Sequence, residues 1–247
     1  MKKLLFILIL IISPVISLKS TEVKLYFNPG IGLYSMYSLS DLNSYFRQSL
    51  PFESKQVSDF PPYWNFDTSL QLWLNDSTRG IAAHYAQEST GSRISRVDYS
   101  GEYSNEFTVN NRIYAAELLY NQPRFHGLSV NYGLKAGIIY TNLFSREYIK
   151  VFEEDTLYTM NAEASSFFIE PGINIFYPVK FLEIGLSAGY LIDFGGEYKI
   201  TQVNGENNMV GYPIGNPNRN EAIKSEWTGF RLRLYFGINI TDLIKSF

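Results

Sequence analysis

Few side chains in this sequence are suited to catalysis. The 247 residues include no cysteine and only two histidines, His84 and His126. The absence of cysteine excludes disulfides, cysteine-ligated zinc, iron–sulfur clusters and thiol catalysis. A Ser/His/acid site around His84 would be hydrolytic, but no GxSxG motif accompanies this residue. A lone histidine is more often structural than catalytic, so we expect no enzyme activity, no cofactor and no metal centre.

Acidic residues form one compact cluster, Glu153, Glu154 and Asp155. Their carboxylates could bind a divalent cation weakly, but the cluster lacks the spacing of an EF-hand loop, which favours a solvated loop instead. The formal net charge of -3 and the pI of about 5.5 indicate no basic face for nucleic acid. We therefore expect no nucleic-acid partner.

The N-terminus has the three parts of a secretory signal peptide. Two lysines follow Met1, residues 4–12 are all apolar, and Pro14 interrupts the run. The apolar stretch is shorter than the roughly 20 residues that span a bilayer as a helix. We predict a signal peptide over residues 1–17, with residue 20 as the alternative end, and hence export of the chain.

The rest of the chain is organised as alternating segments. Residues 230–240 place an apolar side chain at every even position, opposite residues such as Arg231, Arg233 and Gly237. Period 2 over this length is typical of a tilted membrane-spanning strand, whereas a helix would scatter these apolar residues around its circumference. Seven further segments alternate less purely, at residues 23–37, 63–74, 81–88, 105–120, 128–140, 167–175 and 182–193.

The connections between these segments alternate in length. In an up-and-down meander, alternate connections lie at the same end, and transmembrane barrels have short periplasmic turns and long extracellular loops. The sequence therefore predicts one tight rim and one rim with all the long loops. The short connections are residues 75–79, 121–126 and 177–180, and the long ones are residues 38–62, 92–103, 145–163 and 201–225.

The first long connection is expected to contain a short helix. Its apolar residues recur at near-helical spacing, and Pro51 then ends the helix because proline lacks the backbone N–H that a helix needs. The apolar positions of this helix are Leu39, Leu42, Phe46 and Leu50.

Alternation alone does not separate a membrane barrel from a soluble lipocalin-like barrel, which also has eight strands. The polar face here is rich in Gly, Asn and Ser with isolated charges, and the apolar face is large and uniform. Small residues suit a crowded barrel interior, and lipid requires a uniform apolar exterior. We predict an all-β fold: an eight-stranded antiparallel up-and-down transmembrane β-barrel over residues 22–240, followed by a tail over residues 241–247.

Aromatic residues gather near the segment ends. They are either girdles at the two membrane interfaces or an ordinary strand preference for aromatic residues. Tyr63, Trp64 and Trp227 fall at the long-loop rim, and Tyr120, Phe176, Tyr177 and Phe181 fall at the other.

The polar face of the predicted strands carries charges of both signs. Inside a narrow barrel such charges must be paired or hydrated, so we expect a self-neutralising network that fills the lumen. Counting along neighbouring strands puts Lys135 and Glu170 at similar heights, and we expect Glu170 to be coupled to Arg233. The alternative is a narrow ion path. The predicted lumen charges are Asp67, Glu117, Lys135, Glu170, Glu183, Asp193, Arg231 and Arg233.

The pattern over residues 22–240, including the stretches 59–66 and 185–192, resembles the small eight-stranded bacterial outer-membrane barrels of the OmpA/OmpX type. It is most similar to porin-like proteins of the outer membrane protein β-barrel domain family. The resemblance implies a monomer in the lipid bilayer of the bacterial outer membrane, inserted by the outer-membrane assembly machinery. Many chains of this family end in an aromatic residue that the machinery reads, and Phe247 fits by identity but not by parity.

These observations predict an integral outer-membrane barrel without enzymatic activity. Its role would be structural, or would consist of surface binding through the long external loops. A narrow passive pore for small solutes is the first alternative, and a secreted, soluble lipocalin-like barrel is the second.

Overall fold

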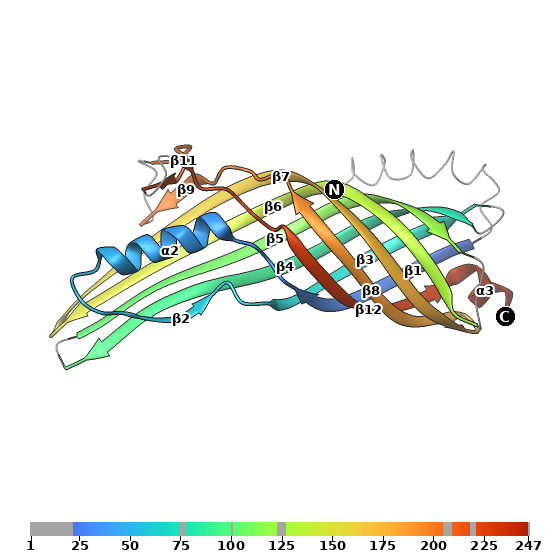
Figure 1. Ribbon diagram of the computed structural model, residues 1–247, viewed down its shortest axis with the longest axis horizontal. Helices are drawn as coiled ribbons and strands as arrows, with labels where there is room; N and C mark the ends of the chain where they lie inside the picture. Colours follow the sequence, from blue (N-terminus) through green and yellow to red (C-terminus); the bar gives the residue numbers. More distant parts are fainter. Residues whose placement is uncertain are drawn as a thin grey trace.

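The fold was examined in a computed structural model, which describes residues 22–74, 78–99, 101–122, 127–204, 209–217 and 221–246. The predicted signal peptide, His126 and Phe247 lie outside these residues. Eight antiparallel strands follow one another around a closed ring (Figure 1), which confirms the predicted barrel. These strands are β1 (Glu22–Gly32), β3 (Tyr63–Trp73), β4 (Arg79–Asp98), β5 (Gly101–Asn121), β6 (Ser129–Val151), β7 (Glu154–Val179), β8 (Leu182–Asp193) and β12 (Gly229–Asn239).

The strands of the ring have two very different lengths. β1, β3, β8 and β12 have 11 or 12 residues, whereas β4, β5, β6 and β7 have 20, 21, 23 and 26 residues. The four long strands therefore continue past the barrel as a sheet, visible at the left of Figure 1. We call this sheet the extension; it consists of residues 89–98, 101–110, 142–151 and 154–163.

Two of the four predicted long loops are wrong, because the extension occupies these residues. Residues 92–103 and 145–163 lie almost entirely in paired strands that end in tight hairpins. The prediction was wrong because it expected apolar side chains on the outer face of every strand. In the extension the outer face is mostly polar instead, and its polar residues were interpreted as loops.

The described parts of the other two long connections lie against the extension, and together they form what we call the cap (residues 33–62, 194–204, 209–217 and 221–228). The predicted helix in the first connection is confirmed by α2, which ends before Leu50 and Pro51 and buries Leu39 and Leu42. The remaining elements are α2 (Tyr37–Ser49), β2 (Lys55–Asp59), β9 (Lys199–Val203), β10 (Gly215–Asn216), β11 (Glu221–Ala222) and, after β12, α3 (Ile240–Lys245). β2 pairs with β4, and β9 pairs with β7.

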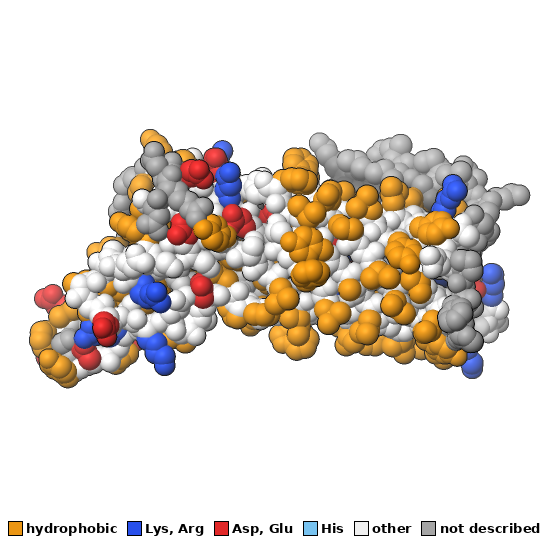
Figure 2. All heavy atoms as spheres, in the orientation of Figure 1, with side chains coloured by type: hydrophobic (Ala, Val, Ile, Leu, Met, Phe, Trp, Pro, Cys, Tyr) orange, Lys and Arg blue, Asp and Glu red, His pale blue; other side chains and the backbone are white. Residues whose placement is uncertain are grey.

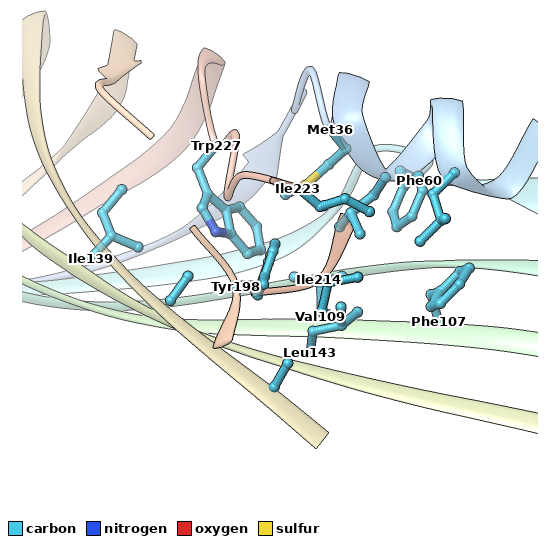
Figure 3. Packing of buried hydrophobic residues seen from close by; sticks show 14 of the residues in the cluster. Met36, Phe60, Phe107, Val109, Ile139, Leu143, Tyr198, Ile214, Ile223 and Trp227 are labelled. Carbon is cyan, nitrogen blue, oxygen red and sulfur yellow. The ribbon is translucent and has the colours of Figure 1, made fainter. Parts of the chain in front are cut away.

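The main hydrophobic core lies between the cap and the extension (Figure 3). Trp227 is completely buried in it, donates a hydrogen bond from Nε1 to Thr141 Oγ1 (2.9 Å), and meets the edge of the Tyr34 ring. Trp227 is therefore not part of an interfacial girdle. Phe176 is also buried, inside the opposite end of the barrel against Tyr235. Neither Trp227 nor Phe176 can therefore belong to an outer aromatic girdle, because both side chains point inward.

The outer surface of the barrel is apolar. Leu118 and Phe167 leave 67% and 68% of their surface exposed, and every even position of β12 from Phe230 to Ile238 is exposed. Figure 2 shows hydrophobic side chains spread over the barrel, while charged groups gather on the cap, the extension and the far end. No helix in the described ranges is long and apolar enough to cross a membrane. An apolar exterior and a polar interior are the reverse of a lipocalin-like barrel.

Candidate functional site

The charged residues of the strands lie inside the barrel because they occupy the inward positions of the alternation. Of the eight predicted lumen charges, all except Asp193 are buried, and Lys24, His84 and Glu88 are buried with them. These side chains come from β1, β3, β4, β5, β6, β7, β8 and β12, so each strand of the ring contributes at least one. The ion pairs connect them at three heights.

The upper group lies next to the cap. Arg231 donates from Nε and Nη2 to the two carboxylate oxygens of Glu88, at 3.0 and 2.8 Å. Its Nη2 also donates to the carbonyl oxygen of Trp227 (2.7 Å), and its guanidinium lies over the Tyr34 ring. Arg233 donates to Glu170 at 2.8 Å and lies 3.6 Å from Glu88. This group therefore joins the barrel wall to the core of the cap.

The middle group lies around a buried histidine. Asp67 accepts hydrogen bonds from Lys135 Nζ (2.8 Å) and lies 2.9 Å from Nδ1 of His84. Nε2 of the same ring lies 2.7 Å from Glu117. Both ring nitrogens can donate at once only in the imidazolium form. With a carboxylate at each nitrogen, His84 has no free ring nitrogen to serve as a base.

The register explains how the middle and upper groups meet. Lys135 pairs directly with Glu170 on the neighbouring strand, the arrangement that counting along the strands predicts. Lys135 Nζ lies 3.8 Å from Glu170, which also pairs with Arg233. The coupled pair of Glu170 and Arg233 is thus part of a chain of alternating charges, so neither residue has a single partner.

The lower group lies near the start of β1. Lys24 donates to Glu183 at 2.8 Å, and the hydroxyl of Tyr26 donates to the same carboxylate. Gln71 donates to the hydroxyl of Tyr235 at 3.0 Å. Glu183 is among the predicted lumen charges, but the two tyrosines and the glutamine were not predicted as members of the network, although their inward parity is visible in the alternation.

Asp193 requires a correction, because it does not join the charges in the lumen. It is half-buried at the last residue of β8, where it accepts hydrogen bonds from the backbone N–H of Trp227 and Gly195 (both 3.0 Å). The strand ends here because Gly195 has φ 74, a left-handed conformation that favours glycine. Asp193 therefore lies at the rim and holds the cap instead.

The space left among these side chains is small. The cavity in the lumen has a volume of about 20 Å³ and is lined by residues including Asp67, His84, Lys135 and Arg233. This volume is about enough for one water molecule. The interior of the barrel is filled by paired side chains at this height.

The second candidate surface is the tip of the extension. Tyr99 is fully exposed, and Phe152 leaves 76% of its surface exposed at the end of the neighbouring hairpin. Behind the tip, a groove of about 520 Å³ is lined by residues such as Phe52 and Tyr103, whose rings meet edge to face. Burial and the nearby Glu147 carboxylate raise the pKa of Tyr103 to about 12. Exposed aromatic side chains of this kind are typical of binding surfaces.

The acidic cluster of Glu153, Glu154 and Asp155 is exposed at the same tip. Within the described part of the chain, no group of three or more His, Asp or Glu side chains is arranged to hold a metal ion. The cluster therefore gives no geometric indication of a cation site.

No family model matches the chain, and no curated protein matches it. Among solved structures, it is similar to Neisserial surface protein A (NspA), with a TM-score of 0.39, 9% sequence identity, and coverage of 90% of this chain and 97% of that chain. It is also similar to Ail, the attachment invasion locus protein of Yersinia pestis, in complex with the heparin analogue sucrose octasulfate (TM-score 0.36, 8% identity, 88% and 97% coverage). The fold assignment rests on the closed ring of eight strands itself.

Proposed function

We propose that this protein is an integral outer-membrane barrel without enzymatic activity, which holds a rigid binding surface outside the cell. The observation that carries the proposal is the contrast between a filled lumen and an ordered, packed cap and extension. The extension and the cap would face the outside, because the long connections of such barrels are extracellular.

The outer surface supports the membrane part of this proposal. On β5 the outward residues from Tyr120 to Tyr114 are apolar or small, and Arg112 is the first charged one. Eight steps of about 3.3 Å separate Tyr120 from Arg112, so the uncharged stretch spans about 26 Å along the strand, and about 20 Å across a bilayer for a strand tilted by about 40°. The apolar band of an outer-membrane barrel is about 25 Å tall.

The filled lumen favours a barrel that serves as a membrane anchor over a barrel that serves as a pore. The Arg231–Glu88 and Arg233–Glu170 pairs lie inside the barrel, and the ion pairs bridge strands on different sides of the ring. An ion would have to displace buried charges that are already paired, which is costly in a low-dielectric interior.

Reconstitution into a planar bilayer tests the choice between anchor and pore. We expect a folded, heat-modifiable barrel that leaves the conductance at the level of lipid alone, with a known porin as the positive control. Discrete, sustained conductance steps from the wild-type protein would favour the passive pore. A mature chain that stays monomeric and soluble without detergent would contradict the membrane barrel.

Capture from native membranes tests the binding surface. The tagged wild-type protein and a variant with Tyr99→Ser and Phe152→Ser would be compared for the partners that they retain after cross-linking. We expect the variant to lose partners while it keeps the heat-modifiable mobility of the barrel, because both residues are exposed at the tip. Equal capture of partners by the two proteins would show that the binding surface does not include Tyr99 and Phe152.

A further inference from the structure

The outer wall formed by β3, β4, β5 and β6 changes from apolar to polar within one row of residues. Tyr85 pairs with Tyr114 on the neighbouring strand, and their rings lie 5.4 Å apart. The next outward row towards the cap pairs Gln87 with Arg112 and Arg112 with Tyr140. Aromatic rings directly below the first cationic residue are typical of the level of lipid headgroups.

A groove opens at this boundary. It has a volume of about 380 Å³, and its lining includes Trp64 and Phe66 from β3, Gln87 from β4, and Arg112 from β5. Further rows towards the cap add the amide side chains of Asn110 and Asn142, which are register partners. The groove therefore combines an apolar wall with several hydrogen-bond donors.

Arg112 is exposed in this groove, whose lining also includes the buried Glu88. Two arginines of the extension make ion pairs nearby, Arg93 with Glu106 and Arg96 with Asp98. Within the described ranges Arg112 makes no such pair, and the neighbouring Glu88 carboxylate is already bound by Arg231 inside the barrel. An exposed guanidinium without an ion-pair partner at an apolar boundary is available to bind an anion.

We propose that this groove binds the phosphate of a net-anionic lipid, with Arg112 as the residue that contacts it. The inference rests on the proposed membrane location of the barrel. A planar guanidinium can donate two parallel hydrogen bonds to phosphate, and the amides of Gln87, Asn110 and Asn142 supply further donors. The acyl chains lie along Trp64, Phe66 and the tyrosine rings below. A zwitterionic lipid fits less well, because its own ammonium group already neutralises the phosphate.

Trp64 provides a reporter for this site. It lies in the groove and leaves 68% of its surface exposed, whereas the other two tryptophans, Trp73 and Trp227, are buried. Bromine atoms on lipid acyl chains quench tryptophan fluorescence on contact. The quenching of Trp64 by one lipid species therefore measures how often that lipid occupies the groove.

The experiment uses the full mature protein in phosphatidylcholine vesicles. A small fraction of the lipid is either brominated phosphatidylglycerol or brominated phosphatidylcholine, with bromine high on the acyl chains. We expect phosphatidylglycerol to be preferred about fivefold in the wild type, as one interfacial arginine predicts, and the preference to disappear in Arg112→Gln. Arg112→Lys, which keeps the charge but loses the paired donors, should retain part of it.

Arg146→Gln is the matched control, because Arg146 is exposed on the same outer face but lies higher in the extension. We expect this variant to keep the wild-type preference. An equal loss in Arg146→Gln and Arg112→Gln would indicate a general surface charge effect and would overturn the site. Heat-modifiability of each variant confirms that the barrel is folded.

The remaining outcomes are also decisive. Loss of the preference on adding inorganic phosphate at constant ionic strength would show that the site takes free phosphate, which overturns the lipid assignment. Equal quenching by both brominated lipids would reject the site but leave the membrane barrel intact. No quenching by either lipid would contradict the membrane location and, with it, the site.

Discussion

The extension continues four of the eight strands of the barrel, and the two faces of these strands exchange environments between the two regions. Along β5, the inward Glu117 and the outward Leu118 lie in the barrel, where the interior is charged and the exterior apolar. Further along the same strand, the inward Phe107 is buried in the apolar core, and the outward Glu106 pairs with Arg93 at the surface. The parity of the strand never changes, although the chemistry of its two faces does.

This difference shows that the surroundings of a strand decide which face is apolar. In lipid the exterior must be apolar, and polar groups are satisfied inside. In water the hydrophobic effect places apolar residues under the cap instead. The exchange occurs between Tyr114 and Arg112, which, under the proposed membrane location, marks the level at which lipid ends. Four predictions test this comparison, from the largest expected effect to the smallest.

The charge pair in the lumen should show the largest effect. Glu170→Gln and Arg233→Met should each lower the free energy of unfolding by about 3–5 kcal/mol, because each leaves a buried charge short of a partner. The double variant should lose less than the sum of the two, since the two side chains are 2.8 Å apart. Denaturant titrations in lipid vesicles measure all three values, and additive losses would rule out direct coupling.

The matched pair on the extension is Arg93 and Glu106, 3.1 Å apart but largely exposed to solvent. Arg93→Met and Glu106→Gln should each cost less than about 1 kcal/mol, because surface ion pairs contribute little. If these variants lowered the free energy of unfolding as much as the lumen variants do, the ion pairs of the two regions would not differ in their contribution to stability.

The apolar core of the extension should be the next most sensitive. Leu143→Ala should cost about 2–5 kcal/mol, because Leu143 is fully buried under the cap. Hydrogen exchange in α2 should speed up, while the barrel keeps its heat-modifiable mobility. Its outward neighbour is the control: Phe144→Ala lies on the exposed face and should leave exchange in α2 nearly unchanged.

A charge on the outer face should distinguish lipid from water. Leu234→Arg, in the middle of the alternating strand β12, should cost about 2–4 kcal/mol because the guanidinium would face the bilayer core. Thr108→Arg, on the outer face of the extension, should cost less than about 0.5 kcal/mol. Unfolding in vesicles measures both, and a similar cost at the two positions would contradict the proposed membrane boundary.

The smallest expected effect is the pH dependence of the stability of the extension. The pKa of Tyr103 is about 12 in the folded protein and 10.0 in an unperturbed tyrosine. The unfolded state therefore loses this proton first, so the stability of the extension is constant below about pH 9 and falls as the pH rises from 10 to 12. Tyr103→Phe should remove this part of the pH dependence, as read from hydrogen exchange along β5 and β6. An unchanged profile in the variant would assign the effect to another group.

The sequence was sufficient for the barrel because period 2 depends only on which face a residue occupies. Arg231 and Arg233 were placed inside by parity, and Lys135 was placed opposite Glu170 by counting. Charged side chains buried in the lumen must form ion pairs. Their partners can therefore be predicted from their positions along the strands. The strongest signal came from β12, where the alternation has no fault.

The cap and the extension were not predictable in the same way. Trp227 was placed at the long-loop rim because it lies near the end of a segment, but its partners Thr141 and Tyr34 are distant in sequence. Asp193 has the inward parity of a lumen charge, yet the strand ends at that residue. Parity does not show where a strand leaves the lipid, and only tertiary packing determines that level.

The unequal strand lengths also have a consequence for the order of assembly. The long strands β4 to β7 are consecutive hairpins whose contacts are local in sequence, whereas closure of the ring pairs Lys24 with Asn239. Local contacts form faster than distant ones, so we expect the long meander to form first and β12 to join last. That last strand carries Arg231 and Arg233, the partners of Glu88 and Glu170. Closing the ring and supplying the arginine partners of Glu88 and Glu170 would therefore be a single kinetic event.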